Sequence, residues 1–115
     1  MLAAQNRLRK TKDIELIFQK GKKAFSQFFL VRYLPNQKPY SRFAVVVSNK
    51  VSKRAVQRNL LKRRVREILR ASLSQLPVGL DLVVLVSPKI INSSKEILSF
   101  EKIKVNLLQT LNKIH

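Results

Sequence analysis

The sequence lacks several residue types on which enzymes commonly rely. It contains no cysteine, which excludes disulfide bonds, thiolate zinc sites and a cysteine nucleophile. Its only glycines, Gly21 and Gly79, cannot form the glycine-rich loops that bind nucleotide phosphates. The single histidine, His115, is the final residue, and we do not expect a terminal side chain to act as a general base. These absences argue against a self-contained enzyme.

Acidic residues are scarce as well. The chain has 24 Lys and Arg against 6 Asp and Glu, which gives a formal net charge of +18 and a pI of about 11.3. A protein nuclease would need paired carboxylates for metal ions or a general base, and the acids of this chain show no metal-binding spacing. We expect no metal ion on the protein alone. The excess of positive charge instead predicts a polyanionic partner.

Hydrophobic residues are numerous but never form a long run. They make up 45% of the 115 residues, enough for a single domain, residues 1–115, with its own core. No stretch approaches the roughly 18 apolar residues of a membrane span, and residues 1–10 lack the apolar run of a signal peptide. We therefore expect a cytoplasmic protein whose residues 1–10 are mobile. Binding to an anionic membrane surface is a minor alternative, since it requires exposed bulky apolar residues opposite the charges.

The strongest pattern is a basic segment in the middle of the chain. Residues 53–75 have a helix-favouring composition without Gly or Pro, and Ser52 stands where an N-cap is expected. Five basic side chains at four-residue intervals form one row on this helix: Arg54, Arg58, Lys62, Arg66 and Arg70. Apolar side chains form another row that can face a core: Leu61, Val65, Ile68, Leu69 and Leu76. A solvated face normally mixes signs, whereas this one has only Glu67, so we favour an anionic partner.

Two further helices are predicted near the ends of the chain. Residues 11–20 predict a short helix that Thr11 caps and that ends at Gly21. Residues 97–114 predict an amphipathic helix with Ser99 as its cap. Its apolar positions recur at steps of three or four: Phe100, Ile103, Leu107, Leu111 and Ile114.

Three segments predict β-strands. Residues 25–34 are rich in aromatic and branched side chains and end at a proline-containing loop. Residues 42–47 and 80–86 are continuous apolar runs, as expected for strands buried on both faces. Because the basic helix lies between these two strands, they should be parallel members of a β-α-β unit. The general rule makes such a crossover right-handed.

The basic helix also carries a recognisable motif. Residues 53–67, KRAVQRNLLKRRVRE, contain the run Ala-Val-x-Arg-Asn-x-x-Lys-Arg, and here the chain resembles the bacterial ribonuclease P protein component. The match extends to Phe18 and Gly21 and to Asp81 and Pro88. The resemblance implies a two-layer α+β domain with a mixed sheet of about four strands and three helices. It also implies a left-handed crossover, in a ribosomal protein S5 domain 2-like fold.

The resemblance implies a division of labour as well. In this family an RNA subunit with bound Mg²⁺ removes the 5′ leader of precursor tRNA, and the protein positions the RNA and the leader. The expected partners are the catalytic RNA and precursor tRNA, with no obligate protein partner. The predicted RNA-binding residues are Lys50, Lys53, Arg54, Arg58, Asn59, Lys62, Arg63, Arg66 and Arg70. The predicted leader-binding residues are Phe18, Lys22, Phe29, Arg32 and Tyr33.

Two other classes of protein share some of these features. A ribosomal or other structural RNA-binding protein would have the same charge, but it has no reason to carry this motif. A helix-turn-helix DNA-binding protein fits less well, because a buried strand and not a short turn precedes the basic helix. The aromatic residues of 25–34 can stack bases, although packing in a core is the commoner fate of such residues.

Overall fold

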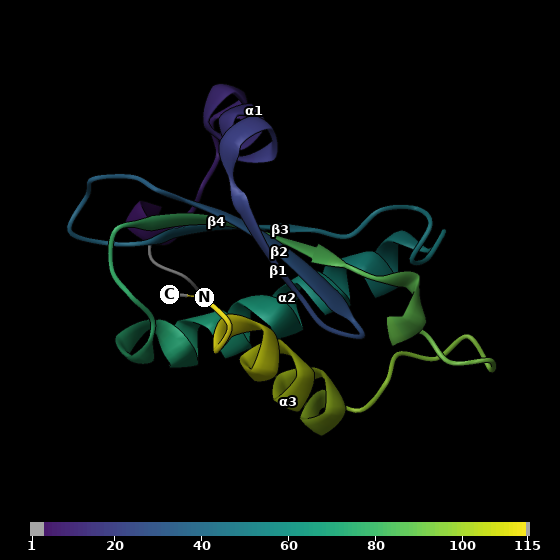
Figure 1. Ribbon diagram of the computed structural model, residues 1–115. Helices are drawn as coiled ribbons and strands as arrows, with labels where there is room; N and C mark the ends of the chain where they lie inside the picture. The colour runs from purple at the N-terminus through teal and green to yellow at the C-terminus, as the bar shows by residue number, and fades with distance from the viewer. Residues whose placement is uncertain (1–3, 115) are drawn as a thin grey trace.

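The structure, a computed structural model, describes residues 4–114 and contains a mixed four-stranded sheet (Figure 1). The strands are β1 (Lys22–Phe25), β2 (Phe29–Pro35), β3 (Arg42–Val46) and β4 (Leu80–Val86). They lie in the order β1-β2-β4-β3, with β3 parallel to β4 and the other pairs antiparallel. The parallel β3-α2-β4 unit is therefore confirmed, and the handedness of its crossover stays a prediction.

Helices cover both faces of this sheet: α1 (Thr11–Lys20) on one, and α2 (Ala55–Ser72) and α3 (Phe100–Leu111) on the other (Figure 1). Successive side chains of a strand point to opposite faces, and β4 shows the result. Leu82 and Val84 pack in the main core with α2 and α3, whereas Val83 packs with Ile17 of α1. The α+β fold is thus confirmed, and α1 adds a partial third layer to the two that were expected.

Strand β4 is buried on both faces along its length, as its apolar run predicts. The same prediction for β3 was wrong on one face. Phe43 and Val45 are buried in the main core, but Val46 on the other side is 37% exposed. The reason is position, because β3 lies at the edge of the sheet, whereas α1 packs against β2 and β4.

The N-terminal segment packs along this edge. Arg7 forms an isolated parallel bridge with Phe43, and the Leu8 amide donates to the Phe43 carbonyl at 2.7 Å. Asn6 and Leu8 are buried. The described part of residues 1–10 is therefore packed against the sheet, and residues 1–3 lie outside the described residues.

The predicted strand 25–34 is in fact the end of β1, a tight turn and β2. The turn contains neither Gly nor Pro, so nothing in the sequence signals it. Its stability comes from a distant side chain instead. Asn106 of α3 accepts hydrogen bonds from the Ser26 hydroxyl at 2.6 Å and from the Phe28 amide at 3.0 Å.

The predicted helix caps are only partly correct. Ser99 caps α3 by accepting from the Lys102 amide, as predicted. Thr11 is the first residue of α1 and makes no cap, because Lys10 occupies that position. Helix α2 begins at Ala55, two residues later than predicted, and Ser52 accepts from the Arg54 amide without being the N-cap. A 3-10 turn, Leu73–Gln75, then extends α2 to its predicted end.

The predicted apolar face of α3 also needs one correction. Ile103, Leu107, Leu111 and Ile114 are buried as expected, but Phe100 is 41% exposed. Phe100 is the first residue of the helix, and the side chains that reach the main core come from the later turns. Among the described helices, none combines the length and the apolar character needed to cross a membrane.

Candidate nucleic-acid interface

The exposed side of α2 carries the basic row that the sequence predicts. Packing sets its direction, since the apolar row of the same helix faces the core. The fully buried members of that row are Leu61, Val65, Ile68 and Leu69, and Leu76 beyond the helix is partly buried. The exposed predicted RNA-binding residues are Lys50, Lys53, Arg54, Asn59, Arg63, Arg66 and Arg70, and Arg58 and Lys62 are half-buried. All nine therefore reach the surface of the molecule.

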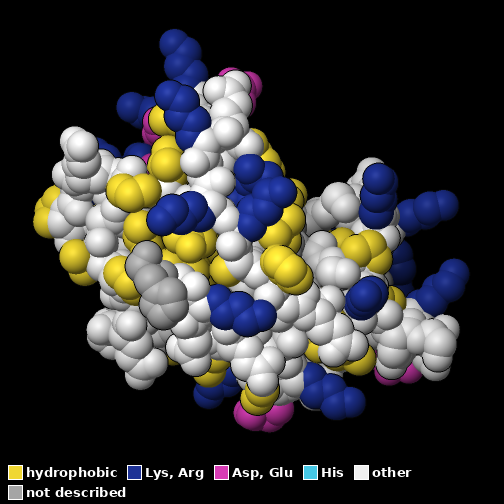
Figure 2. All heavy atoms as spheres, in the orientation of Figure 1, with side chains coloured by type: hydrophobic (Ala, Val, Ile, Leu, Met, Phe, Trp, Pro, Cys, Tyr) yellow, Lys and Arg dark blue, Asp and Glu magenta, His cyan; other side chains and the backbone are white. Residues whose placement is uncertain are grey.

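The charge of this surface is nearly of one sign. Glu67 is the single acid of α2, and Arg70 donates to its Oε2 at 3.2 Å. This hydrogen bond lowers the pKa of Glu67, so the carboxylate stays charged at neutral pH. Arg58 is held by a different contact, because its Nη1 donates to the Ser52 carbonyl at 3.0 Å. Figure 2 shows the same imbalance over the visible face, where Lys and Arg far outnumber acidic side chains.

Two hollows extend the basic surface to residues that the sequence analysis missed. At the start of α2, a hollow of about 500 Å³ is lined by Lys50, Lys53 and Arg54 together with Lys95. Further along, a hollow of about 270 Å³ brings Arg7 and Arg9 beside Arg66. In the sequence, Arg7, Arg9 and Lys95 are distinguished only by their positive charge. Their proximity to α2 depends on tertiary structure, which no local pattern indicates.

The predicted leader-binding residues do not all lie together. Phe18 of α1 and Arg32 of β2 are in contact: Arg32 Nη2 donates to the Phe18 carbonyl at 2.6 Å, and the guanidinium carbon is 5.4 Å from the ring centre. Phe29 and Tyr33 are buried in the main core, on the opposite face of the sheet. Residues 29, 31 and 33 of β2 share that face because the strand alternates. The prediction that these two rings are open to bases was therefore wrong.

The predicted leader-binding residue Lys22, in β1, also lies on the other face of the sheet from Phe18 and Arg32. Paired residues of neighbouring strands point to the same face. Lys22 pairs with Tyr33, and Lys23 pairs with Arg32. Lys23 is therefore the lysine that accompanies Arg32 and Phe18 on the α1 side of the sheet. Lys23 could not be distinguished from Lys22 in the sequence, because β1 was not among the predicted strands and its register was therefore unknown.

The α1 side of the sheet is only partly covered. Phe18 is 39% exposed at the end of α1, and Phe25 at the end of β1 is 66% exposed. Beyond α1, a hollow of about 450 Å³ is lined by Phe25, Leu30 and Leu85. Basic and apolar groups thus lie on the same open surface. Such a surface can stack unpaired bases and neutralise their phosphates.

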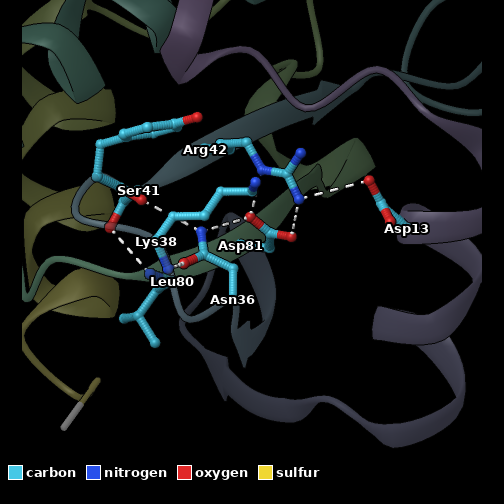
Figure 3. Close-up of polar contacts among 8 residues, drawn as sticks. Asp13, Asn36, Lys38, Ser41, Arg42, Leu80 and Asp81 are labelled. Carbon is cyan, nitrogen blue, oxygen red and sulfur yellow. Dashed lines mark hydrogen bonds and ion pairs between the residues drawn. The ribbon is translucent and has the colours of Figure 1, made fainter.

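A buried ion pair lies at the other end of this surface (Figure 3). Arg42 donates to Asp81 from Nε at 2.8 Å and from Nη2 at 2.5 Å, and Asn36 donates to Asp81 Oδ1 at 2.8 Å. Arg42 Nη2 also lies 3.4 Å from Asp13 Oδ2 of α1. The hydrogen bond to Asp81 raises the pKa of Arg42 above its ordinary value, so the guanidinium is always charged. The first residues of β3 and β4 and the first turn of α1 are thereby joined.

The described residues do not offer a set of metal ligands. Within residues 4–114, no three His, Asp or Glu side chains come together as a metal site requires. Asp13 and Asp81 are close to each other, but both direct oxygens at Arg42. The side chains of residues 4–114 therefore do not form a ligand set that fits a catalytic Mg²⁺.

Comparison with known proteins gives a consistent result. A family model described as Ribonuclease P matches residues 2–114. The ribonuclease P protein component of Thermotoga maritima is 38% identical over 110 residues, covering 96% of this chain and 92% of the relative. That of Petrotoga mobilis is 34% identical with the same coverage. The solved RNase P protein from Thermotoga maritima has a TM-score of 0.85 at 37% identity, covering 95% of this chain and 97% of that one. The Staphylococcus aureus RNase P protein has a TM-score of 0.81 at 26% identity, covering 94% of each chain.

Proposed function

The chain belongs to the ribonuclease P protein family, and from this premise we propose that it binds the catalytic RNA through α2 and the precursor tRNA leader through the α1 side of the sheet. It is the protein component of a ribonucleoprotein endonuclease of tRNA processing, which implies association with the ribonuclease P RNA. The two surfaces would allow one small protein to touch enzyme RNA and substrate at once. The proposed location is the cytoplasm, where precursor tRNA is made.

The contact with the catalytic RNA rests on the exposed face of α2. Arginine suits phosphate because its planar guanidinium donates two hydrogen bonds to one anion. Arg54, Arg63 and Arg66 are exposed on this face, and its single acid already has Arg70 as a partner. Asn59, which lies among them, can donate to or accept from an RNA group. This concentration of one charge is the observation that carries the proposal.

The contact with the leader rests on the other face of the sheet. Phe18 offers an exposed ring, and Arg32 and Lys23 offer cations within the same surface. A flexible single strand fits this arrangement better than a duplex, because its bases are free to stack on an aromatic ring. Phe29 and Tyr33 would support the surface from beneath, within the core. Mg²⁺ is assigned to the RNA, since the described side chains of the protein do not form a suitable ligand set.

Reconstitution tests the proposal directly. Nuclease-treated protein should cleave no precursor tRNA alone, because the described residues form no cluster of acidic or histidine side chains that could hold a catalytic metal ion. Added to a bacterial ribonuclease P RNA at low Mg²⁺ concentration, it should restore cleavage and favour precursor over mature tRNA in binding. Cleavage by the RNA-free protein would contradict the division of labour. Failure to bind the RNA or to stimulate it would instead favour a structural RNA-binding protein.

A further inference from the structure

Helix α1 is attached to the sheet at both ends by arginines of other elements. At its first turn, Asp13 Oδ2 lies 3.4 Å from Arg42 Nη2 of β3. At its last turn, the Phe18 carbonyl accepts from Arg32 Nη2 of β2 at 2.6 Å. Each contact matches the helix dipole, since the negative side chain is near the N-terminus and the cation is near the C-terminus. Two polar contacts, one at each end, thus contribute to the position of α1 over the sheet.

The apolar contacts of α1 belong to a cluster that is much smaller than the main core. Ile17 is its one buried residue, and it packs in a small cluster with Leu8 and Val83. Ile14 is partly buried, and Leu16 and Phe18 are exposed on the surface. A helix held by so small a cluster can tilt about it at modest cost. Its orientation therefore depends on the contacts at its ends.

Arg42 is well suited to fix one of those ends. Asp81 holds its guanidinium through two hydrogen bonds, and Asn36 holds Asp81 in turn (Figure 3). A buried ion pair gives little stability over a well-packed apolar pair of the same size. The pair of Arg42 and Asp81 instead holds the guanidinium of Arg42 in a fixed position. In Figure 3 the Asp13 side chain points from α1 toward that cation.

We propose that Asp13 is a positioning residue for leader recognition, acting through Arg42 to fix the tilt of α1 and hence the place of Phe18. The inference rests on the proposed leader site. Phe18 comes five positions after Asp13, about 7.5 Å along the helix axis, so a tilt at one end of the helix displaces the other. Asp13 itself does not contact the leader. Its effect should therefore appear in the preference for precursor tRNA and not in binding of the catalytic RNA.

The experiment compares three variants in the reconstituted holoenzyme. Asp13→Asn removes the ion pair, and Asp13→Glu keeps a carboxylate within reach of Arg42. Glu15→Gln is the matched control, because it removes the same charge from the same helix, is exposed and has no ion pair among the described residues. Both neutral variants raise the net charge equally, so any general gain in RNA affinity is common to them. The dissociation constants of precursor and mature tRNA, that of the catalytic RNA, and the melting point are measured for each.

Asp13→Asn is expected to lose about two- to fivefold of the precursor preference, the effect of one partly exposed ion pair. Asp13→Glu and Glu15→Gln should keep that preference, and Asp13→Asn should bind the catalytic RNA as tightly as Glu15→Gln does. The inference is overturned if Asp13→Asn keeps the full preference, weakens both tRNAs equally, or unfolds at the assay temperature. The inference is also overturned if Glu15→Gln loses as much of the precursor preference as Asp13→Asn does. A parent holoenzyme without any precursor preference would instead show that the proposed leader site itself is absent.

Discussion

Gly21 follows the last turn of α1 because nothing larger fits there. A Cβ atom at this position would stand 2.4 Å from the Ile17 carbonyl oxygen and 3.0 Å from that of Tyr33. Its φ of −71° is open to any residue, so the requirement is one of space. The close approach lets the chain turn directly from α1 into β1. That turn brings the end of α1 close to β2.

Replacing Gly21 with Ala should therefore destabilise the protein. Both obstacles are backbone atoms, which cannot move without shifting α1 or β2. We expect a loss of about 1 to 3 kcal/mol in the free energy of unfolding, the usual cost of overpacking. Urea denaturation measures it. Gln19→Ala is the control, since Gln19 is exposed on the same helix, and equal stability of the two variants would refute the steric argument.

Phe18 is the residue whose loss should affect leader binding most clearly. Stacking of one base on an aromatic ring contributes roughly 1 to 3 kcal/mol, so Phe18→Ala should weaken precursor tRNA binding by about five- to a hundredfold. Mature tRNA lacks the leader and should bind almost unchanged. Both affinities are measured by titration of the holoenzyme.

A matched control separates stacking from general loss of apolar surface. Phe100 on α3 is 41% exposed, close to the 39% of Phe18, but lies away from α1. Phe100→Ala should leave the preference for precursor tRNA intact. If Phe18→Ala keeps both its melting point and its precursor preference, Phe18 is not in the leader site.

Single residues also show what a sequence alone can and cannot reveal. The aromatic character of Phe29 and Tyr33 was evident, but their side of the sheet was not. It depends on where β2 begins, and a shift of one residue reverses every side chain. The turn that starts β2 is held by Asn106, far away in the sequence. Local patterns therefore identified the site elements but could not assign all their faces.

At the scale of elements, predictability followed the strength of the apolar pattern. The bounds of β4 were predicted correctly, because an apolar-rich run of seven residues, 80–86, begins directly after Gly79 and ends just before Ser87 and Pro88. The basic face of α2 was predicted for the same reason, since its two rows have different chemistry. Strand β1 is only Lys22–Phe25, with one buried residue. Such a short segment does not show the alternation of apolar and polar residues that identifies a strand.

Helix α2 acts as a unit, and its role can be tested through salt dependence. Every phosphate that the protein no longer neutralises should reduce the slope of log affinity against log salt by about 0.7 to 0.9, because fewer counterions are released. Arg66→Ala and Arg58→Ala should each weaken binding to the catalytic RNA and flatten this slope. Titrations at several salt concentrations provide both values.

Loss of one positive charge elsewhere serves as the comparison. Lys104→Ala removes an exposed cation from α3, outside the hollows that adjoin α2. Lys104→Ala should reduce the affinity for the catalytic RNA less than Arg58→Ala or Arg66→Ala does. Its slope of log affinity against log salt should stay closer to that of the parent. If neither Arg58 nor Arg66 differs from Lys104 in this assay, the α2 face is not the RNA-binding surface.

The whole molecule carries a charge that works against its own folding. With a formal +18 on 115 residues, like charges repel one another in the compact state. An anion that binds only the folded protein should stabilise it by mass action. We expect sulfate to raise the melting point, measured by circular dichroism, more than chloride does at equal ionic strength. Identical melting points in the two salts would show that screening alone acts and that no anion is bound.

The N-terminal segment along β3 has a consequence for how copies of the protein behave toward one another. Arg7 and Leu8 occupy part of the sheet edge that would otherwise offer free N–H and C=O groups. An uncovered edge is a template for strand addition by a second chain. A variant lacking residues 1–8 should stay dispersed at low salt, where repulsion keeps copies apart, and aggregate as salt shortens the Debye length to about 10 Å and below. If the light scattering of this variant does not increase with salt, the sheet edge does not need to be covered. The expected increase would show that residues 1–8 prevent self-association.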